Sequence, residues 1–371
     1  MKSNSSRISV SNKYGINHVT LIYLIFLLLF IIIPLCVSPE WIYNRDVVVE
    51  KVNTNGKEEW QVKIDSGFDD FSEVILEFPE GYIVGGTFMY NDARGRCASE
   101  KPCDYAQKYP RIIWVRKDGN IAQDSIYVSD RLSGEPVSFF QTFDGKFISG
   151  SDRSIVKLGE NKKVLFKKIF DGFYYIFSII ETPNRDYTLV GLRARNNTFP
   201  PSPWIASISQ NGEFLWEYYF PNTSTFREVA DAGDGAYLIA DDENRLYFMD
   251  SSGHLSWNRS GLGEIWAMRP SGDGYQILVP GRSYDLNKDG NITRSVSFKA
   301  IDPVIWTKDG GFAAVSIGGE NIVLTRFDQD GKVLWQQGNP NQHRAKPVSL
   351  IETSDGGFAI LLTVNNKTPG T

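Results

Sequence analysis

The chain has 371 residues, a net charge of −5 and an aromatic content of 13%. Because the charge is mildly negative and no long basic block occurs, the composition argues against a nucleic-acid-binding protein, which needs a concentrated positive surface. Beyond the first 40 or so residues the length suits one large domain, and abundant glycine with many aromatic residues is typical of short strands and tight turns.

The N-terminal segment predicts a membrane anchor. The run Val19–Val37 contains no charged residue and as a helix would span roughly 28 Å, close to the ~30 Å hydrocarbon core of a bilayer. Lys2, Arg7 and Lys13 precede it without any acidic residue, so the positive-inside rule places the N-terminus in the cytoplasm. A cleaved signal peptide is the competing interpretation, although its apolar region is normally shorter.

Two cysteines, Cys97 and Cys103, lie in a polar, loop-like stretch after the first β-rich runs. In an oxidising compartment they would close a small disulfide ring. A two-cysteine metal site is the alternative, but no histidine or further cysteine lies near them in the sequence.

One short phrase recurs seven times along the rest of the chain. It consists of a β-rich run, a polar turn usually centred on Gly, and a Trp or another large apolar residue a few positions later. The turns, most often about 40 residues apart, are centred on Gly56, Gly119, Asn161, Gly212, Gly253, Gly290 and Gly331. A strand-built repeat of this period is typical of a β-propeller.

Each repeat predicts a blade of four strands. The six complete blades are expected at 68–130, 134–172, 173–222, 225–260, 262–300 and 301–340. The C-terminal segment Lys346–Asn365 supplies only a first and a second strand, and Asp46–Ile64 supplies only a third and a fourth. Together they predict a seventh blade that closes the ring and removes two exposed strand edges. Six or eight blades would follow from misreading one irregular repeat.

These patterns divide the chain into five predicted parts. They are a cytoplasmic tail at 1–18, a transmembrane helix at 19–38, a linker at 39–45, the propeller at 46–365 and a tail at 366–371. The expected protein is a single-pass membrane protein with its propeller outside the cell or in the periplasm.

The phrase Asp328–Trp335, followed by Ser354–Phe358, resembles the repeats of quinoprotein-like (PQQ-like) β-propellers. The resemblance covers 46–365 at the level of the repeat. It implies that the Trp at the end of each phrase docks against the neighbouring blade. The quinone-dependent dehydrogenases of that family bind calcium and use a catalytic Asp, but no segment here matches those roles.

One turn has the spacing of a calcium loop. Asp285, Asn287 and Asp289 offer oxygen ligands at positions 1, 3 and 5, with Gly290 at position 6, but position 12 is Val296 where such loops carry Glu. The segment also falls in register with the turn of every other blade. An ordinary hairpin is therefore the favoured interpretation, calcium the alternative, and no other cofactor is expected.

The predicted binding surface lies on the long connections between second and third strands. Two such connections, 88–110 and 193–203, are enlarged. Tyr and Arg side chains often anchor interfaces, and long loops on a rigid scaffold often serve recognition. The candidate residues are Tyr90, Arg94, Arg96, Tyr105, Tyr109, Arg195 and Phe199.

The sequence contains no catalytic constellation that can be recognised from spacing. We therefore expect a non-catalytic, membrane-anchored propeller that binds a protein or a glycan at the cell surface through its loop face. The alternative is a propeller enzyme, either a quinone-dependent oxidoreductase or a carboxylate-based glycosidase or lyase. An enzyme would need converging charged groups with perturbed pKa values near the ring centre.

Overall fold

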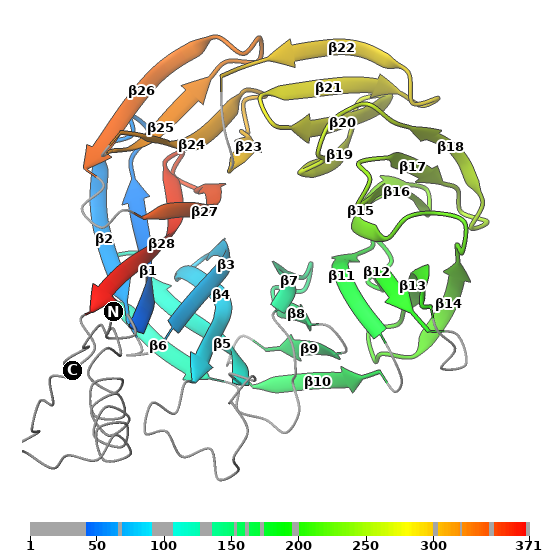
Figure 1. The fold of residues 1–371 in the computed structure, drawn as a ribbon, viewed down its shortest axis with the longest axis horizontal. Coiled ribbons are helices and arrows are strands. Elements are labelled where there is room, and N and C mark those ends of the chain that lie inside the picture. The colour runs from blue at the N-terminus through cyan, green and yellow to red at the C-terminus, as the bar shows by residue number, and fades with distance from the viewer. Residues whose placement is uncertain are drawn as a thin grey trace, which may run out of the picture. The chain divides into compact units, whose positions relative to one another are not determined.

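The computed structural model describes residues 42–65, 69–90, 107–126, 136–151, 154–159, 163–170, 174–194, 200–299, 303–319, 321–340 and 345–368. Residues Asn44–Asn366 make up one compact unit. Its described strands form seven four-stranded antiparallel sheets around a common centre, and the first strand of each sheet lies closest to that centre (Figure 1). The prediction of an all-β, seven-bladed propeller is confirmed.

The blades follow one another along the chain, four strands at a time. Blades 1 to 3 consist of β3 (Asp69–Phe78), β4 (Gly81–Tyr90), β5 (Gln107–Arg116) and β6 (Ile121–Ile126); β7 (Pro136–Gln141), β8 (Phe147–Ser151), β9 (Ser154–Leu158) and β10 (Val164–Ile169); and β11 (Tyr174–Glu181), β12 (Tyr187–Arg193), β13 (Ser202–Ile208) and β14 (Phe214–Tyr219). Blades 4 to 6 consist of β15 (Phe226–Gly233), β16 (Ala236–Asp241), β17 (Leu246–Met249) and β18 (Leu255–Arg259); β19 (Ala267–Ser271), β20 (Gly274–Val279), β21 (Arg282–Asn287) and β22 (Ile292–Ser297); and β23 (Val304–Trp306), β24 (Phe312–Gly318), β25 (Asn321–Phe327) and β26 (Val333–Pro340).

Blade 7 is built from both ends of the described chain. It consists of β27 (Lys346–Glu352), β28 (Phe358–Thr368), β1 (Ile42–Val52) and β2 (Glu58–Ile64), in the order β2-β1-β28-β27. The C-terminal hairpin thus supplies its two inner strands and the N-terminal hairpin its two outer strands.

The hydrophobic core is divided among the junctions between blades. Each of the seven clusters of buried apolar side chains combines residues of two neighbouring sheets. Every second strand also carries a buried aromatic residue at its first or second position. These residues are Tyr82, Phe147, Tyr187, Tyr237, Tyr275, Phe312 and Phe358. Since every junction buries its own apolar surface, each blade is held by its two neighbours.

At several junctions between blades, a Trp of the fourth strand packs on the neighbouring blade. The ring of Trp257 in β18 covers Gly290 in the next blade, and its Nε1 donates to the backbone oxygen of Lys288 at 2.9 Å. Trp60 in β2 covers Gly119 of blade 1 in the same manner. Gly290 has φ of +75°, and a Cβ there would lie 2.8 Å from the Trp257 ring. Glycine is therefore required for two reasons, backbone conformation and close packing.

A buried lysine joins the two chain ends in blade 7. Lys51 in β1 is 2% exposed, and its Nζ donates to the backbone oxygen of Val52 at 3.0 Å. The same Nζ lies 3.0 Å from Asp355 in the β27–β28 turn and 2.9 Å from Glu59 in β2. Burial raises the pKa of Asp355, but hydrogen bonds from Thr353 and Gly357 and the charge of Lys51 outweigh it and lower that pKa to about 2.

Two expectations differ from the structure or fall outside it. The connection expected at 88–110 is shorter than predicted, because strand pairing continues through Phe88↔Tyr109 to Tyr90↔Gln107. No helix long and apolar enough to cross a bilayer occurs among the described residues, and the anchor predicted at 19–38 lies outside them.

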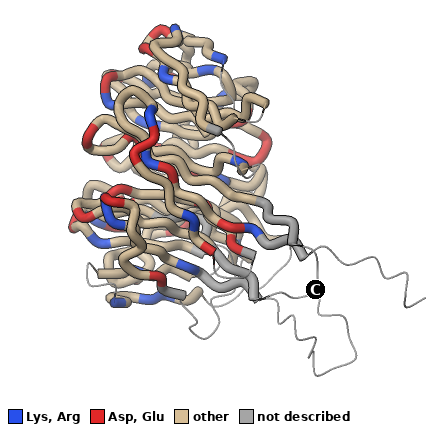
Figure 2. Tube along the Cα trace, turned by 90° about the vertical axis from the view of Figure 1, so that its left-hand side faces the viewer, with Lys and Arg blue, Asp and Glu red and all other residues tan. Residues whose placement is uncertain are grey.

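Lys and Arg are interspersed with Asp and Glu on the side of the propeller in Figure 2.

The packing of Trp257 on the neighbouring turn can be tested with paired glycine substitutions. Gly290→Ala and Gly310→Ala both place a side chain at positive φ, which costs about 1–2 kcal/mol, but a Cβ at Gly310 meets no atom within 4 Å. We expect Gly290→Ala to lose about 1–3 kcal/mol more than Gly310→Ala in urea unfolding, because the Trp257 ring has to move. Equal losses would contradict the packing described.

The closure of blade 7 can be tested at Lys51. Lys51→Met keeps the length of the side chain but removes its hydrogen bonds and ion pairs, so we expect unfolding in urea to require about 1–3 kcal/mol less free energy. Lys332→Met, which alters an exposed lysine in the turn of blade 6, is the control and is expected to stay within about 0.5 kcal/mol of the wild type.

Candidate functional site

Five of the seven first strands carry a β-bulge. At comparable places the pairing register with the second strand skips Glu73, Val137, Phe177, Arg227 and Val348, and β15 skips Ala232 as well. A bulge leaves its extra residue outside the ladder and re-aims its side chain. Because first strands form the inner edge of every sheet, the bulges vary the chemistry of the ring's inner surface (Figure 1).

The bulged residues of blades 3 and 4 lie against each other. The Arg227 guanidinium lies 4.1 Å from the centroid of the Phe177 ring, and the Tyr175 ring stacks on Phe177 at 6.3 Å with an interplanar angle of 11°. Tyr175 is 37% exposed and the Arg227 side chain 48% exposed. With Glu228, which follows Arg227 in β15, these residues are called the inner-strand cluster.

Glu228 adds a carboxyl group that titrates near neutral pH. Solvent reaches this side chain, yet protein atoms around it displace much of its hydration water. This desolvation raises its pKa to about 7, against the lowering effect of a hydrogen bond with Ser178 of β11. The inner-strand cluster therefore combines an exposed cation with a carboxyl whose charge depends on pH in the physiological range.

Strand pairing shows on which face the inner-strand cluster lies. Tyr174, at the start of β11, pairs with Arg193, the last residue of β12, and Phe226 pairs with Asp241 at the end of β16. The connections from second to third strands leave the blades from these ends. The cluster therefore lies toward the face that carries those connections, which we call the loop face.

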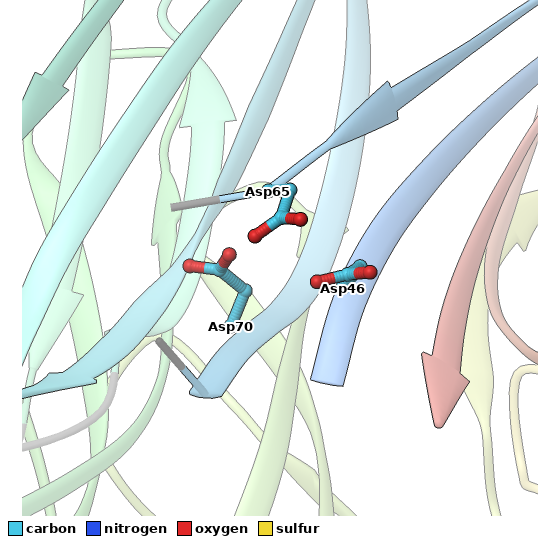
Figure 3. A group of neighbouring side chains, drawn as sticks. All are labelled: Asp46, Asp65 and Asp70. Carbon is cyan, nitrogen blue, oxygen red and sulfur yellow. The ribbon is translucent and has the colours of Figure 1, made fainter. Parts of the chain in front are cut away.

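Three aspartates converge where blade 7 meets blade 1 (Figure 3). Asp46 lies in β1, Asp65 follows β2 and Asp70 lies in β3, and one carboxylate oxygen of each lies within 4.8 Å of the others. By geometry such a group could hold a metal ion. Two cations already contact it, since Lys63 Nζ lies 2.5 Å from Asp46 and Arg111 pairs with Asp70.

These cations support a structural role for the three aspartates. The hydrogen bond with Asp46 raises the pKa of Lys63. Burial acts to lower the pKa of Arg111, but its bonds with Asp124 and Asp70 raise it. Lys63 pairs with carboxylates of blade 7, and Arg111 pairs with carboxylates of blade 1. Each cation therefore offsets the negative charge of its own blade where the two blades meet at the loop face.

A pocket of about 310 Å³ lies at the opposite ends of the first strands of blades 5, 6 and 7. In its wall the Arg269 guanidinium stacks 4.4 Å from the Trp306 ring. Glu352, also in the wall, accepts the backbone N–H of Lys308 at 2.6 Å. This carboxylate therefore fastens blade 7 to blade 6.

The predicted loop residues are only partly placed by the structure. Tyr90 ends β4 and Tyr109 lies in β5, so both belong to strands and not to the connection between them. The other predicted binding residues, Arg94, Arg96, Tyr105, Arg195 and Phe199, and the predicted disulfide residues Cys97 and Cys103, lie outside the described residues. Their roles stay predictions.

The calcium-like turn forms the hairpin between β21 and β22. Asn287 Oδ1 accepts the backbone N–H groups of Asp289 and Asn291 at 3.1 and 2.8 Å. Asp285 accepts from Gln276 Nε2 at 2.9 Å and lies 3.7 Å from Arg294. The oxygens of Asp285 and Asn287 thus have protein partners, and calcium binding at Asp285, Asn287 and Asp289 stays a prediction.

The inner-strand cluster was not predicted from the sequence, because a β-bulge interrupts the alternation of side-chain direction along a strand. One signal was present: Gly191 lies opposite the bulge in β11, where a Cβ would lie 1.8 Å from the backbone oxygen of Tyr175. Gly86 occupies the corresponding place in blade 1. Glycine inside a strand often marks a bulge.

Comparisons with known proteins support the fold alone. No family model matches the chain, and no curated protein matches it. Virginiamycin B lyase from Staphylococcus aureus is 14% identical, with a TM-score of 0.52 over 85% of this chain and 99% of that chain. The WD40 domain of Pan2 from Neurospora crassa is 12% identical, with a TM-score of 0.53 over 81% of this chain and 91% of that chain. Both are similar as propellers, and membership of the quinoprotein-like family is not shown.

The environment of Glu228 predicts a dependence of stability on pH. A carboxyl with a higher pKa in the folded state than its ordinary value of about 4.3 lowers stability as pH rises between the two values. We expect the melting temperature of Glu228→Gln, relative to wild type, to be similar at pH 4.5 and clearly higher at pH 8. Glu264→Gln, which removes an exposed carboxyl outside the cluster, provides the reference. A difference that does not grow with pH would contradict the raised pKa.

Proposed function

We propose that this protein is a membrane-anchored, extracytoplasmic propeller that binds a partner protein through the inner-strand cluster and the neighbouring connections of the loop face. The observation that carries the proposal is Arg227, an exposed guanidinium held against Phe177 at the inner edge of blade 4. The predicted anchor at 19–38 and the basic residues before it support the location.

The environment of Arg227 fits recognition of a carboxylate. Stacking on Phe177 holds the guanidinium plane, which lowers the entropy lost when its N–H groups bind a ligand. Its nearest acidic partner, Asp242, lies 3.9 Å away and is itself 36% exposed, so this ion pair is weak. A bidentate bond with a carboxylate of the partner would be stronger.

A protein partner suits the surface better than a glycan. The Arg227 guanidinium already occupies one face of the Phe177 ring, with the Tyr175 ring 6.3 Å away, so less of the ring is available for stacking on a sugar. The predicted binding residues also extend over two connections beyond the cluster, and a protein interface of typical size covers about 800 Å² on each partner. Tyr and Arg are frequent anchors of such interfaces.

The observation that favours an enzyme is Glu228, whose pKa of about 7 suits a proton donor or acceptor. The nearest carboxyl on the same strand with a raised pKa is Asp231, where burial is the main cause. The two are three positions apart in the sequence, and the strand pairs regularly between them, so their side chains point to opposite faces. They do not form the facing pair that carboxylate-based hydrolysis uses.

Arg227 provides the test of the proposed function. Full-length protein in detergent is cross-linked to cell-envelope proteins, and the captured partner is then measured against wild-type protein and variants. We expect Arg227→Ala to weaken partner binding at least tenfold, and Arg227→Lys to restore part of it, because lysine cannot make the bidentate bond. Arg294→Ala is the matched control, since Arg294 is similarly exposed at 44% and paired with Asp330 at 2.6 Å, but lies on an outer strand.

Two outcomes would contradict the proposal. Equal binding by Arg227→Ala and Arg294→Ala would remove the inner-strand cluster from the interface. Binding that survives proteolysis of the partner fraction but disappears after its deglycosylation would identify a glycan as the ligand.

A further inference from the structure

The third and fourth strands pair in the same register in every blade, which makes positions comparable between blades. In blades 7, 2 and 6 the third-strand residue opposite Trp60, Phe166 or Trp335 is a cation, namely Lys51, Lys157 or Arg326. Each of these cations is buried and pairs with an aspartate in the first turn of its own blade, namely Asp355, Asp144 or Asp309. Three junctions thus contain a cation supplied by the chain itself.

Blades 3, 4 and 5 have Ser207, Phe248 and Asp285 in that place, and blade 1 has an aromatic residue. The equivalent third-strand residue is Trp114, which is 3% exposed and lies opposite Gln123 of β6. The first turn of blade 1, between Phe78 and Gly81, carries Glu80 as its acidic residue. The junction between blades 1 and 2 therefore keeps a carboxylate but lacks the cation at this position.

A second polar contact between blades, a hydrogen bond accepted by a glutamate, also differs at this junction. In blades 1, 3 and 7 a glutamate at the end of the first strand accepts a backbone N–H from the preceding blade's turn: Glu77 from Ser354 at 2.5 Å, Glu181 from Phe143 at 2.5 Å and Glu352 from Lys308 at 2.6 Å. Blade 2 has Gln141 there. Its Nε2 donates to Gly145 of its own hairpin at 3.3 Å. The residue of blade 1 that corresponds to Ser354, Phe143 and Lys308 is Pro79, which has no backbone N–H to donate across the junction.

A pocket of about 630 Å³ lies at this junction between blades 1 and 2. Its aromatic walls are Trp114, Phe78 and Phe147, and the last two rings meet edge to face with centroids 6.3 Å apart. Glu80 and Arg116 line it as exposed charged residues. Arg116 lies near Asp118, whose pKa is lowered mainly by hydrogen bonds from Asn120 and further by the charge of Arg116. Asp118 thus offsets part of the positive charge of Arg116.

We infer that this pocket binds an organic cation, an alkylammonium or guanidinium group, beside the first turn of blade 1, because three other blades place a lysine or arginine of the chain against the carboxylate of that turn. Aromatic ring faces attract cations, most strongly where water is excluded, and a neighbouring carboxylate adds to that attraction. The volume is in the range of small-molecule sites. The pocket lies beside the turns between first and second strands, at the end of the blades opposite the loop face, so the inference does not depend on the proposed function.

The first experiment compares a cation with a neutral molecule of the same shape. Binding of choline to the full-length protein in detergent is measured by calorimetry and by ligand-observed NMR, beside 3,3-dimethylbutan-1-ol, which replaces the charged nitrogen by carbon. We expect choline to bind at least tenfold more tightly. N-acetyl-lysinamide and N-acetyl-argininamide form a second arm, and tighter binding of either one than of choline would identify a side chain of a polypeptide as the source of the cation.

Two variants locate the site. Glu80→Gln removes an exposed charge without touching the core and is expected to weaken choline binding about fivefold. Phe78→Leu removes one aromatic wall and is expected to weaken it further. Glu213→Gln, which alters an exposed glutamate in the third-to-fourth turn of blade 3, is the matched control and is expected to leave binding unchanged. Thermal unfolding of each variant shows whether the fold is retained, and Glu80→Gln carries the test if Phe78→Leu does not fold.

Either of two results would overturn the inference. Equal affinity for choline and 3,3-dimethylbutan-1-ol would show an apolar pocket without preference for charge. Choline binding that Glu80→Gln and Glu213→Gln leave equally intact would place the cation elsewhere.

Discussion

Every sheet of this propeller has two apolar faces, and each face has to be covered by a neighbouring sheet. In β1, Val48 packs into the cluster shared with blade 6, while the next residue, Val49, packs into the cluster shared with blade 1. Ile360 and Leu361 of β28 divide in the same way. An open ring would leave two such faces in water, so the rest of the structure depends on joining the N-terminal and C-terminal hairpins into blade 7.

The closure combines apolar burial with polar bonds that span the two chain ends. Lys51 links β1 to the β27–β28 turn, and Glu77 of blade 1 then accepts two hydrogen bonds from Ser354 in that turn. Charged groups in such places are costly unless they are paired, and the pairing requires a defined geometry. The polar contacts therefore specify which strands meet, while the apolar clusters supply most of the driving force.

The architecture could be predicted because its signals are local and repeated. Positive φ at Gly290 and Gly331 follows from the hairpin that the sequence phrase describes, and the split blade follows from counting strands at the two ends. The inner-strand cluster could not be predicted, since the contact between Phe177 and Arg227 depends on two bulges in different blades. The full length of two strands in blade 1 was not predicted either. β4 and β5 pair through Tyr90, in a stretch whose polar composition suggested a loop.

The bulges also explain why the inner edge can vary without loss of the fold. A first strand is paired on one side only, so an extra residue such as Arg227 interrupts a single ladder and leaves the third and fourth strands in register. The junction between blades 1 and 2 varies in a different way. Trp114 packs in its apolar cluster, while the polar contacts found at several other junctions are missing from it. The two features lie in different junctions and at opposite ends of the strands. Substitutions in one should therefore add to substitutions in the other without coupling, as is usual for distant sites that share no partner.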